Sequence, residues 1–199
     1  MASVEACWLR QANALGIGAR LVATDGHALV IAWAEGRLVV EWLRDDATTA
    51  DMARWLVREA LAQCYRLDAA GINKQEMTHP ERHMIIVSDG EVVRADEAAT
   101  LAGNVGGGDT GAVERAAGLR LVMIDFERCA RTCKPKNTTQ VAQFLGSKHV
   151  RELLSNKGLM TNVEALRRAT QAYKQSPPAQ VQAALEDVFH ALVGADEGR

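Results

Sequence analysis

Two carboxylates follow a short apolar run in the second half of the chain. The segment RLVMIDFERCA, residues 120–130, predicts a strand that ends at Asp125, with Glu127 two residues further on. At a strand end these acids are either solvated or able to hold a cation. Mg²⁺ prefers hard oxygen ligands, and one or two carboxylates are commonly its protein anchors. The residue types therefore permit a metal site at Asp125, and the other elements must show what else would reach it.

A helix is expected at the start of the chain. Residues 3–16 have the apolar spacing of an amphipathic helix, with Ser3 as the N-cap and Gly16 as the residue that ends it. The apolar stripe of this helix comprises Val4, Trp8, Leu9, Ala12 and Leu15.

A hairpin and a second helix follow. The runs ARLVAT, residues 19–24, and ALVIAW, residues 28–33, flank an Asp-Gly-His turn, which is typical of a β-hairpin. A long helix then begins after Thr48 or Thr49 and ends at Gly71. Its buried face should contain Met52, Leu56, Ala60 and Cys64.

The middle of the chain predicts loops and short strands. Residues 72–83 lack periodicity and contain a proline, so we expect a loop that leads into a strand with the sequence MIIV. Residues 103–118 are rich in glycine and poor in large apolar side chains, which predicts a flexible insertion. The remainder should be helical, with helices near 138–154, 161–175 and 177–193.

Composition excludes several classes of protein. The chain has 199 residues and a net charge of −2, and no Lys/Arg-rich run suggests binding to nucleic acid. The N-terminus lacks the features of a signal peptide, and the apolar stretches are too short to span a membrane. The four scattered cysteines are then most simply reduced thiols, so we expect a cytoplasmic protein. The order of elements does not alternate as βαβ, which favours an α+β fold that is mainly helical.

Four segments together resemble a known family. They are VEACWLRQANALGIGARLVATDGHALVIAWAEGRLVVEWL (4–43), INKQEMTHPERHMIIV (72–87), VMIDFERC (122–129) and KPKNTTQVAQFL (134–145). In their order and spacing they resemble the protein kinase superfamily in its small atypical branch, which includes RIO-type and KEOPS-complex kinases and short archaeal kinase-like proteins. The resemblance implies a reduced N-terminal lobe at 1–36, with a helix and a β-hairpin, and a kinase C-lobe-like helical domain at 37–199.

The resemblance also implies a site for ATP and Mg²⁺. Asp125 stands where the kinase motif has its metal-binding aspartate, Glu76 where the catalytic base is expected, and His83 where a second metal ligand is expected. A glutamate is one methylene longer than aspartate, and a neutral imidazole is a poorer Mg²⁺ ligand than an amide oxygen. His83 is therefore better explained as a hydrogen-bonding loop residue than as a metal ligand.

Other positions are assigned to the nucleotide by the same resemblance. Glu5 corresponds to the glutamate of the regulatory helix, although a solvated first-turn acid is an equal alternative. Trp33, Ala34 and Glu35 fall at the hinge that would face adenine, where Trp33 fits a core aromatic better than a ligand contact.

A small basic cluster follows the Asp-Phe-Glu motif. Lys134 and Lys136, with Arg131, would either contact phosphate or lie solvated in a loop. Cys129 and Cys133 lack a second pair of ligands at zinc spacing, so free thiols are expected.

Two kinase elements have no counterpart in these residues. The glycine-rich loop and the strand lysine that pairs with the helix glutamate are missing from the matched segments, so weak nucleotide binding and little phosphotransfer are expected. Three functions follow: a protein kinase acting on a protein substrate, a kinase-like binding or scaffolding module without catalysis, or an unrelated helical interaction domain.

Overall fold

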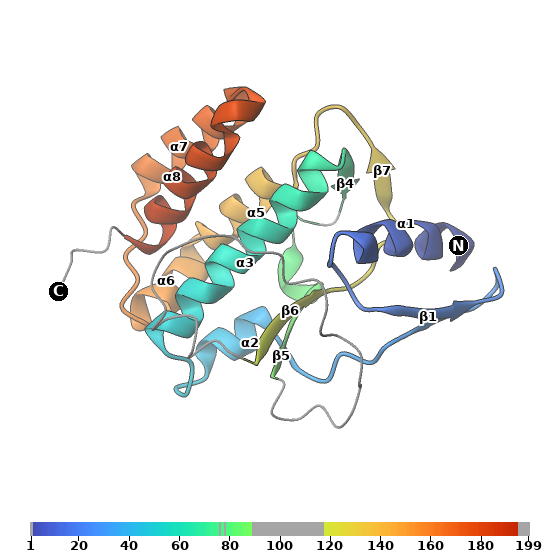
Figure 1. Cartoon of the computed structure of the whole chain (residues 1–199). Helices are drawn as coiled ribbons and strands as arrows, with labels where there is room; N and C mark the ends of the chain where they lie inside the picture. The colour runs from blue at the N-terminus through green and yellow to red at the C-terminus, as the bar shows by residue number, and fades with distance from the viewer. Residues whose placement is uncertain (1, 76, 78, 89–117, 195–199) are drawn as a thin grey trace.

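The fold is a mixed α+β arrangement with small antiparallel sheets, as the order of elements predicts (Figure 1). A computed structural model describes residues 2–75, 77, 79–88 and 118–194. The helices are α1 (Ala2–Ala14), α2 (Val39–Arg44), α3 (Ala50–Ala69), α5 (Asn137–Leu145), α6 (Lys148–Asn156), α7 (Val163–Gln175) and α8 (Val181–Val193), with 3₁₀ turns η1 (Pro80–Arg82) and η2 (Pro178–Gln180). The strands are β1 (Leu21–Thr24), β2 (Leu29–Ile31), β3 (Arg37–Leu38), β4 (Ile72–Lys74), β5 (Met84–Ser88), β6 (Leu119–Met123) and β7 (Cys129–Arg131).

Three small sheets connect distant parts of the described chain. Strands β1 and β2 form the predicted hairpin, β5 lies between β3 and β6, and β4 pairs with β7; all these pairs are antiparallel. The expectation of a loop throughout residues 72–83 is therefore wrong at both ends. The segment begins as strand β4 and contains the turn η1, because β7 supplies backbone partners that no local pattern reveals.

Helix α1 differs from the prediction at its N-terminus. It begins at Ala2, so Ser3 lies within the first turn and is not the N-cap. Val4 is half exposed, and the buried face is formed by Ala6, Leu9 and Ala12. Gly16 ends the helix as predicted, with a φ of +70° that an L-residue with a side chain adopts only at a cost.

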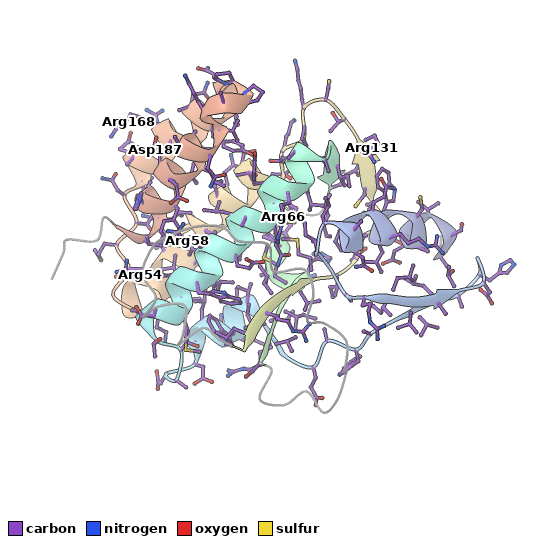
Figure 2. All side chains as sticks on the ribbon, viewed as in Figure 1. Arg54, Arg58, Arg66, Arg131, Arg168 and Asp187 are labelled. Atoms are coloured by element: carbon purple, nitrogen blue, oxygen red, sulfur yellow. The ribbon has the colours of Figure 1, made fainter. Side chains whose placement is uncertain are left out.

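Helix α3 crosses the centre of the molecule, with α5 and α8 packed along it (Figure 1). Thr49 is its N-cap, since the side chain accepts a hydrogen bond from the Met52 N–H. Thr48 instead donates its hydroxyl proton to the carbonyl of Trp42. The side chain of Arg58 reaches α8, where it pairs with Glu186 at 3.0 Å (Figure 2).

The single helix expected at 138–154 is two helices. Gly146 and Ser147 separate α5 from α6, and the Ser147 side chain caps α6. A Cβ atom at Gly146 would lie 2.4 Å from Cδ2 of Leu166, so glycine lets α7 approach closely here. The other two predicted helices are present as α7 and as η2 followed by α8.

Two predictions fall outside the described residues: Glu76, and nearly all of the insertion at 103–118. In the described part of the chain, no helix combines the length and the apolar character needed to cross a membrane.

Candidate functional site

Asp125 has an unusual backbone conformation at the end of β6. Its φ is +64°, and it is the only non-glycine residue with positive φ among those that the structure describes. This left-handed region is sparsely populated, and residues held there cost on the order of 1 kcal/mol or more and cluster at functional sites. The backbone is fixed on one side by the Ile124 N–H, which donates to the carbonyl of His83 at 3.0 Å. The turn leaves the Asp125 side chain about one-third exposed (34%).

His83 lies beside this carboxylate. The register of β5 and β6 pairs Met84 with Met123, so the residue before β5 and the residues after β6 meet at one sheet end. Nδ1 of His83 is 3.5 Å from Oδ2 of Asp125. The structure therefore brings together two of the residues that the sequence assigned to a metal site.

Helix α1 reaches the same place through Glu5. Its Oε1 lies 3.4 Å from the backbone N of Phe126, which donates to it. The contact joins residues that are 121 positions apart. Glu5 is therefore not simply a solvated first-turn acid, and it connects the helix to the residue that follows Asp125.

Gly18 explains how α1 can approach so closely. Its φ is +84°, and a Cβ atom there would lie 2.9 Å from Cε2 of Phe126 and 3.3 Å from the carbonyl oxygen of Met123. Only glycine combines this backbone conformation with room for the Phe126 ring. The Gly-Ile-Gly segment thus serves to pack the N-terminal elements against the end of β6.

Lys74 is a residue of this region that the sequence analysis missed. It is 1% exposed, and its Nζ is 5.4 Å from the centroid of the Phe126 ring, within cation–π distance. Burial raises the pKa of the neighbouring Cys129 thiol to about 11; the charge of Lys74 opposes this increase, while those of Asp125 and Glu5 add to it. The charges of Lys74, Asp125 and Glu5 therefore all influence the pKa of the same thiol.

Asn137 holds the strand that carries Lys74. Its Oδ1 accepts from the Lys74 N–H at 2.8 Å, and its Nδ2 donates to the carbonyl of Ile72 at 2.6 Å and to Oδ1 of Asp68 at 2.7 Å. Asn137 is fully buried, so this bridge is shielded from water. Its only sequence signal is its place after Lys-Pro-Lys, which does not reveal partners more than sixty residues away.

The three residues predicted at the hinge differ in their burial. Ala34 and Ile124 both pack against a small apolar cluster that contains Val87 and Val122, so the segment after β2 lies against strands β5 and β6. Trp33 is 87% exposed, so the expectation of a core aromatic is wrong. The hairpin is too small to cover so large a side chain. Glu35 is also exposed.

The basic cluster after β7 is not assembled as one site. Arg131 hydrogen-bonds to the carbonyl of Ala70 and to Gln11, so it joins the end of α3 to α1 (Figure 2). Lys134 and Lys136 are exposed in the loop before α5, and no hydrogen bond or ion pair connects either of these described side chains to Asp125.

The side chains around Asp125 can hold a metal ion only if substrate phosphates and water fill its other coordination positions. Asp125 supplies hard oxygen atoms and His83 an imidazole, whereas one Glu5 oxygen already accepts from the Phe126 N–H. No group of three or more His, Cys, Asp or Glu side chains that could hold a metal occurs within residues 2–75, 77, 79–88 and 118–194. Mg²⁺ is often held by one or two carboxylates together with substrate phosphates and water, and the site fits this mode through Asp125.

Comparisons with known proteins add no assignment. No protein-family model, no curated protein and no solved structure matches this chain.

Proposed function

We propose that this chain forms part of a protein kinase-like nucleotide site in which Asp125 is the anchor for Mg²⁺–ATP. The observation that carries the proposal is the meeting of three distant segments at the end of β6. Glu5 from α1 contacts Phe126, and His83 lies beside an Asp125 held at positive φ. Their order along the chain is the one that the sequence resemblance assigns to a phosphotransferase, although His83 differs in type from the residue expected at its position.

Each residue has a physical role in this proposal. The Asp125 carboxylate is exposed enough to meet a ligand, and the left-handed turn fixes its direction. Glu5 holds the Phe126 backbone and so couples α1 to the turn. Ala34 packs against the same small apolar cluster as Ile124, and in this proposal the adenine ring contacts the hinge segment there. When bound, Mg²⁺ neutralises phosphate charge during phosphoryl transfer.

One feature favours the alternative of a kinase-like binding module without catalysis. The group that lies 3.5 Å from the Asp125 carboxylate is the imidazole of His83 rather than an amide or carboxylate oxygen. Imidazole is a poor ligand for Mg²⁺, so a second metal would be bound weakly and phosphotransfer would be slow. Weak nucleotide binding with little phosphotransfer is the expected behaviour.

Calorimetric titration with ATP in the presence and absence of Mg²⁺ tests the proposal. We expect Mg²⁺-dependent binding with a Kd on the order of millimolar, or about 4 kcal/mol. Asp125→Asn removes the charge but retains a side chain that tolerates positive φ, so it should weaken binding by roughly tenfold or more without loss of fold.

Asp46→Asn is the matched control, because it removes an equally negative but exposed carboxylate between α2 and α3. The affinity of the Asp46→Asn variant for Mg²⁺–ATP should equal that of the unmodified chain. Binding that is independent of Mg²⁺, or equally weakened in both variants, would contradict the proposal. Transfer of γ-phosphate from labelled ATP to a generic protein substrate distinguishes a slow kinase from a binding module.

A further inference from the structure

A cavity of about 610 Å³ opens between α2, η1, α5 and α6. Small-molecule sites commonly have volumes of roughly 300 to 1,000 Å³, with apolar walls and a few converging polar groups. The apolar wall here includes Leu38 at the end of β3, Val40 on α2, Phe144 on α5 and Val150 on α6. The cavity is therefore large enough for a small ligand with an apolar body.

Basic side chains from three elements converge on this cavity. Arg44 comes from α2, Arg82 from η1 and His149 from α6. Nη2 of Arg44 is 3.2 Å from Nε2 of His149, although the two residues are 105 positions apart. A guanidinium can only donate, so in this contact the imidazole nitrogen must accept. The donors that remain for an anion are then the other guanidinium N–H groups of Arg44 and the Nδ1–H of His149.

Two acidic residues also line the cavity, and among the described residues neither forms an ion pair with Arg44 or His149. Glu81 has its own partner, since its Oε1 is 3.6 Å from Nδ1 of His79. Glu41 lies one turn before Arg44 on α2 and also lines the cavity. On α6, Lys148 lies outside the lining and is 4.0 Å from Glu152, so it belongs to a separate surface pair.

The geometry points to a binding site for a small organic phosphomonoester in this cavity. The phosphate accepts hydrogen bonds from Arg44 and His149, with Arg82 adding charge from η1. Guanidinium groups bind phosphate through paired, charge-assisted hydrogen bonds, and these are stronger than neutral ones. The organic body of the ligand contacts Phe144 and Val150. This site does not use Asp125, and the inference is independent of the proposed nucleotide site.

Phenyl phosphate is the probe, with inorganic phosphate and phenol as its two halves. Nuclear magnetic resonance titration of the ¹⁵N-labelled full chain reports affinity and position together. Saturable shifts should concentrate on residues of α2, η1 and α6, and phenyl phosphate should bind more tightly than either half. Arg44→Gln and His149→Gln should each weaken binding by roughly tenfold or more.

Two control variants make the outcome decisive. Lys148→Gln removes a neighbouring cation that does not line the cavity, and Asp125→Asn alters only the proposed nucleotide site; neither should change the affinity for phenyl phosphate. Absence of saturable binding at millimolar phenyl phosphate overturns the inference. So does equal weakening by Lys148→Gln, which would indicate nonspecific charge attraction. Equal affinity for inorganic phosphate would overturn the assignment of an organic phosphomonoester, because the apolar wall would then add nothing to binding.

Discussion

Asp68 connects three helices, and its removal should be costly. Its Oδ1 accepts from the backbone N–H of Asn137 at 3.0 Å and from Nδ2 of that residue at 2.7 Å. Its Oδ2 accepts from the Thr138 N–H at 3.1 Å and from the Tyr173 hydroxyl at 3.2 Å. The carboxylate at the end of α3 therefore caps the start of α5, whose preceding residue, Lys136, provides no side-chain cap.

The size of the effect follows from the burial of these donors. Asn137 is 0% exposed and Thr138 is 1% exposed, so their N–H groups cannot recover a partner from water without local opening. Hydrogen bonds to charged groups contribute about 1.5 to 3 kcal/mol each, and bonds within one network are not additive. Because Asp68 is itself only partly buried, we expect Asp68→Ala to reduce the free energy of unfolding by about 3 kcal/mol.

Urea unfolding followed by circular dichroism measures this loss, and the Tm should fall by about 6 to 12 °C. Tyr173→Phe removes one donor and should lower the free energy of unfolding by about 1 kcal/mol. Burial raises the pKa of the Tyr173 phenol, so it remains a donor throughout the neutral range. Asp46→Ala is the exposed control and should change stability by less than about 0.5 kcal/mol. A loss below about 1 kcal/mol for Asp68→Ala would refute this reasoning.

Three further predictions concern Gly18, Cys129 and Trp33. Gly18→Ala should lower the free energy of unfolding by about 1 to 3 kcal/mol, because its Cβ would meet the Phe126 ring; unchanged urea unfolding would contradict the close contact. Cys129 should react with iodoacetamide much more slowly than exposed Cys7 at pH 8, and its rate should keep increasing toward pH 11, since its raised pKa leaves little thiolate; equal rates by peptide mass spectrometry would contradict its burial. Trp33→Ser should change stability by less than about 0.5 kcal/mol in the same unfolding assay, and a large loss would mean that this side chain is packed.

Local patterns were sufficient for most of the secondary structure. The spacing of Leu56, Ala60 and Cys64 predicted the buried face of α3, and all three are fully buried. The Asp-Gly-His turn predicted the hairpin, and Gly16 predicted the end of α1. These features depend on side-chain periodicity and on backbone conformations that only a few residue types adopt. A short stretch of sequence is therefore enough to predict them.

Tertiary structure decided the composition of the candidate site. The sequence named Glu5, His83 and Asp125 separately, but their meeting depends on the β5–β6 register and on the packing of α1. The burial of Lys74 and the exposure of Trp33 were not predicted, because lysine and tryptophan can occur on either side of a strand or segment. Contacts between residues 60 to 120 positions apart produce no periodic pattern in the sequence. Only the folded structure therefore shows which polar groups are hydrogen-bonded and which aromatic side chains are exposed to solvent.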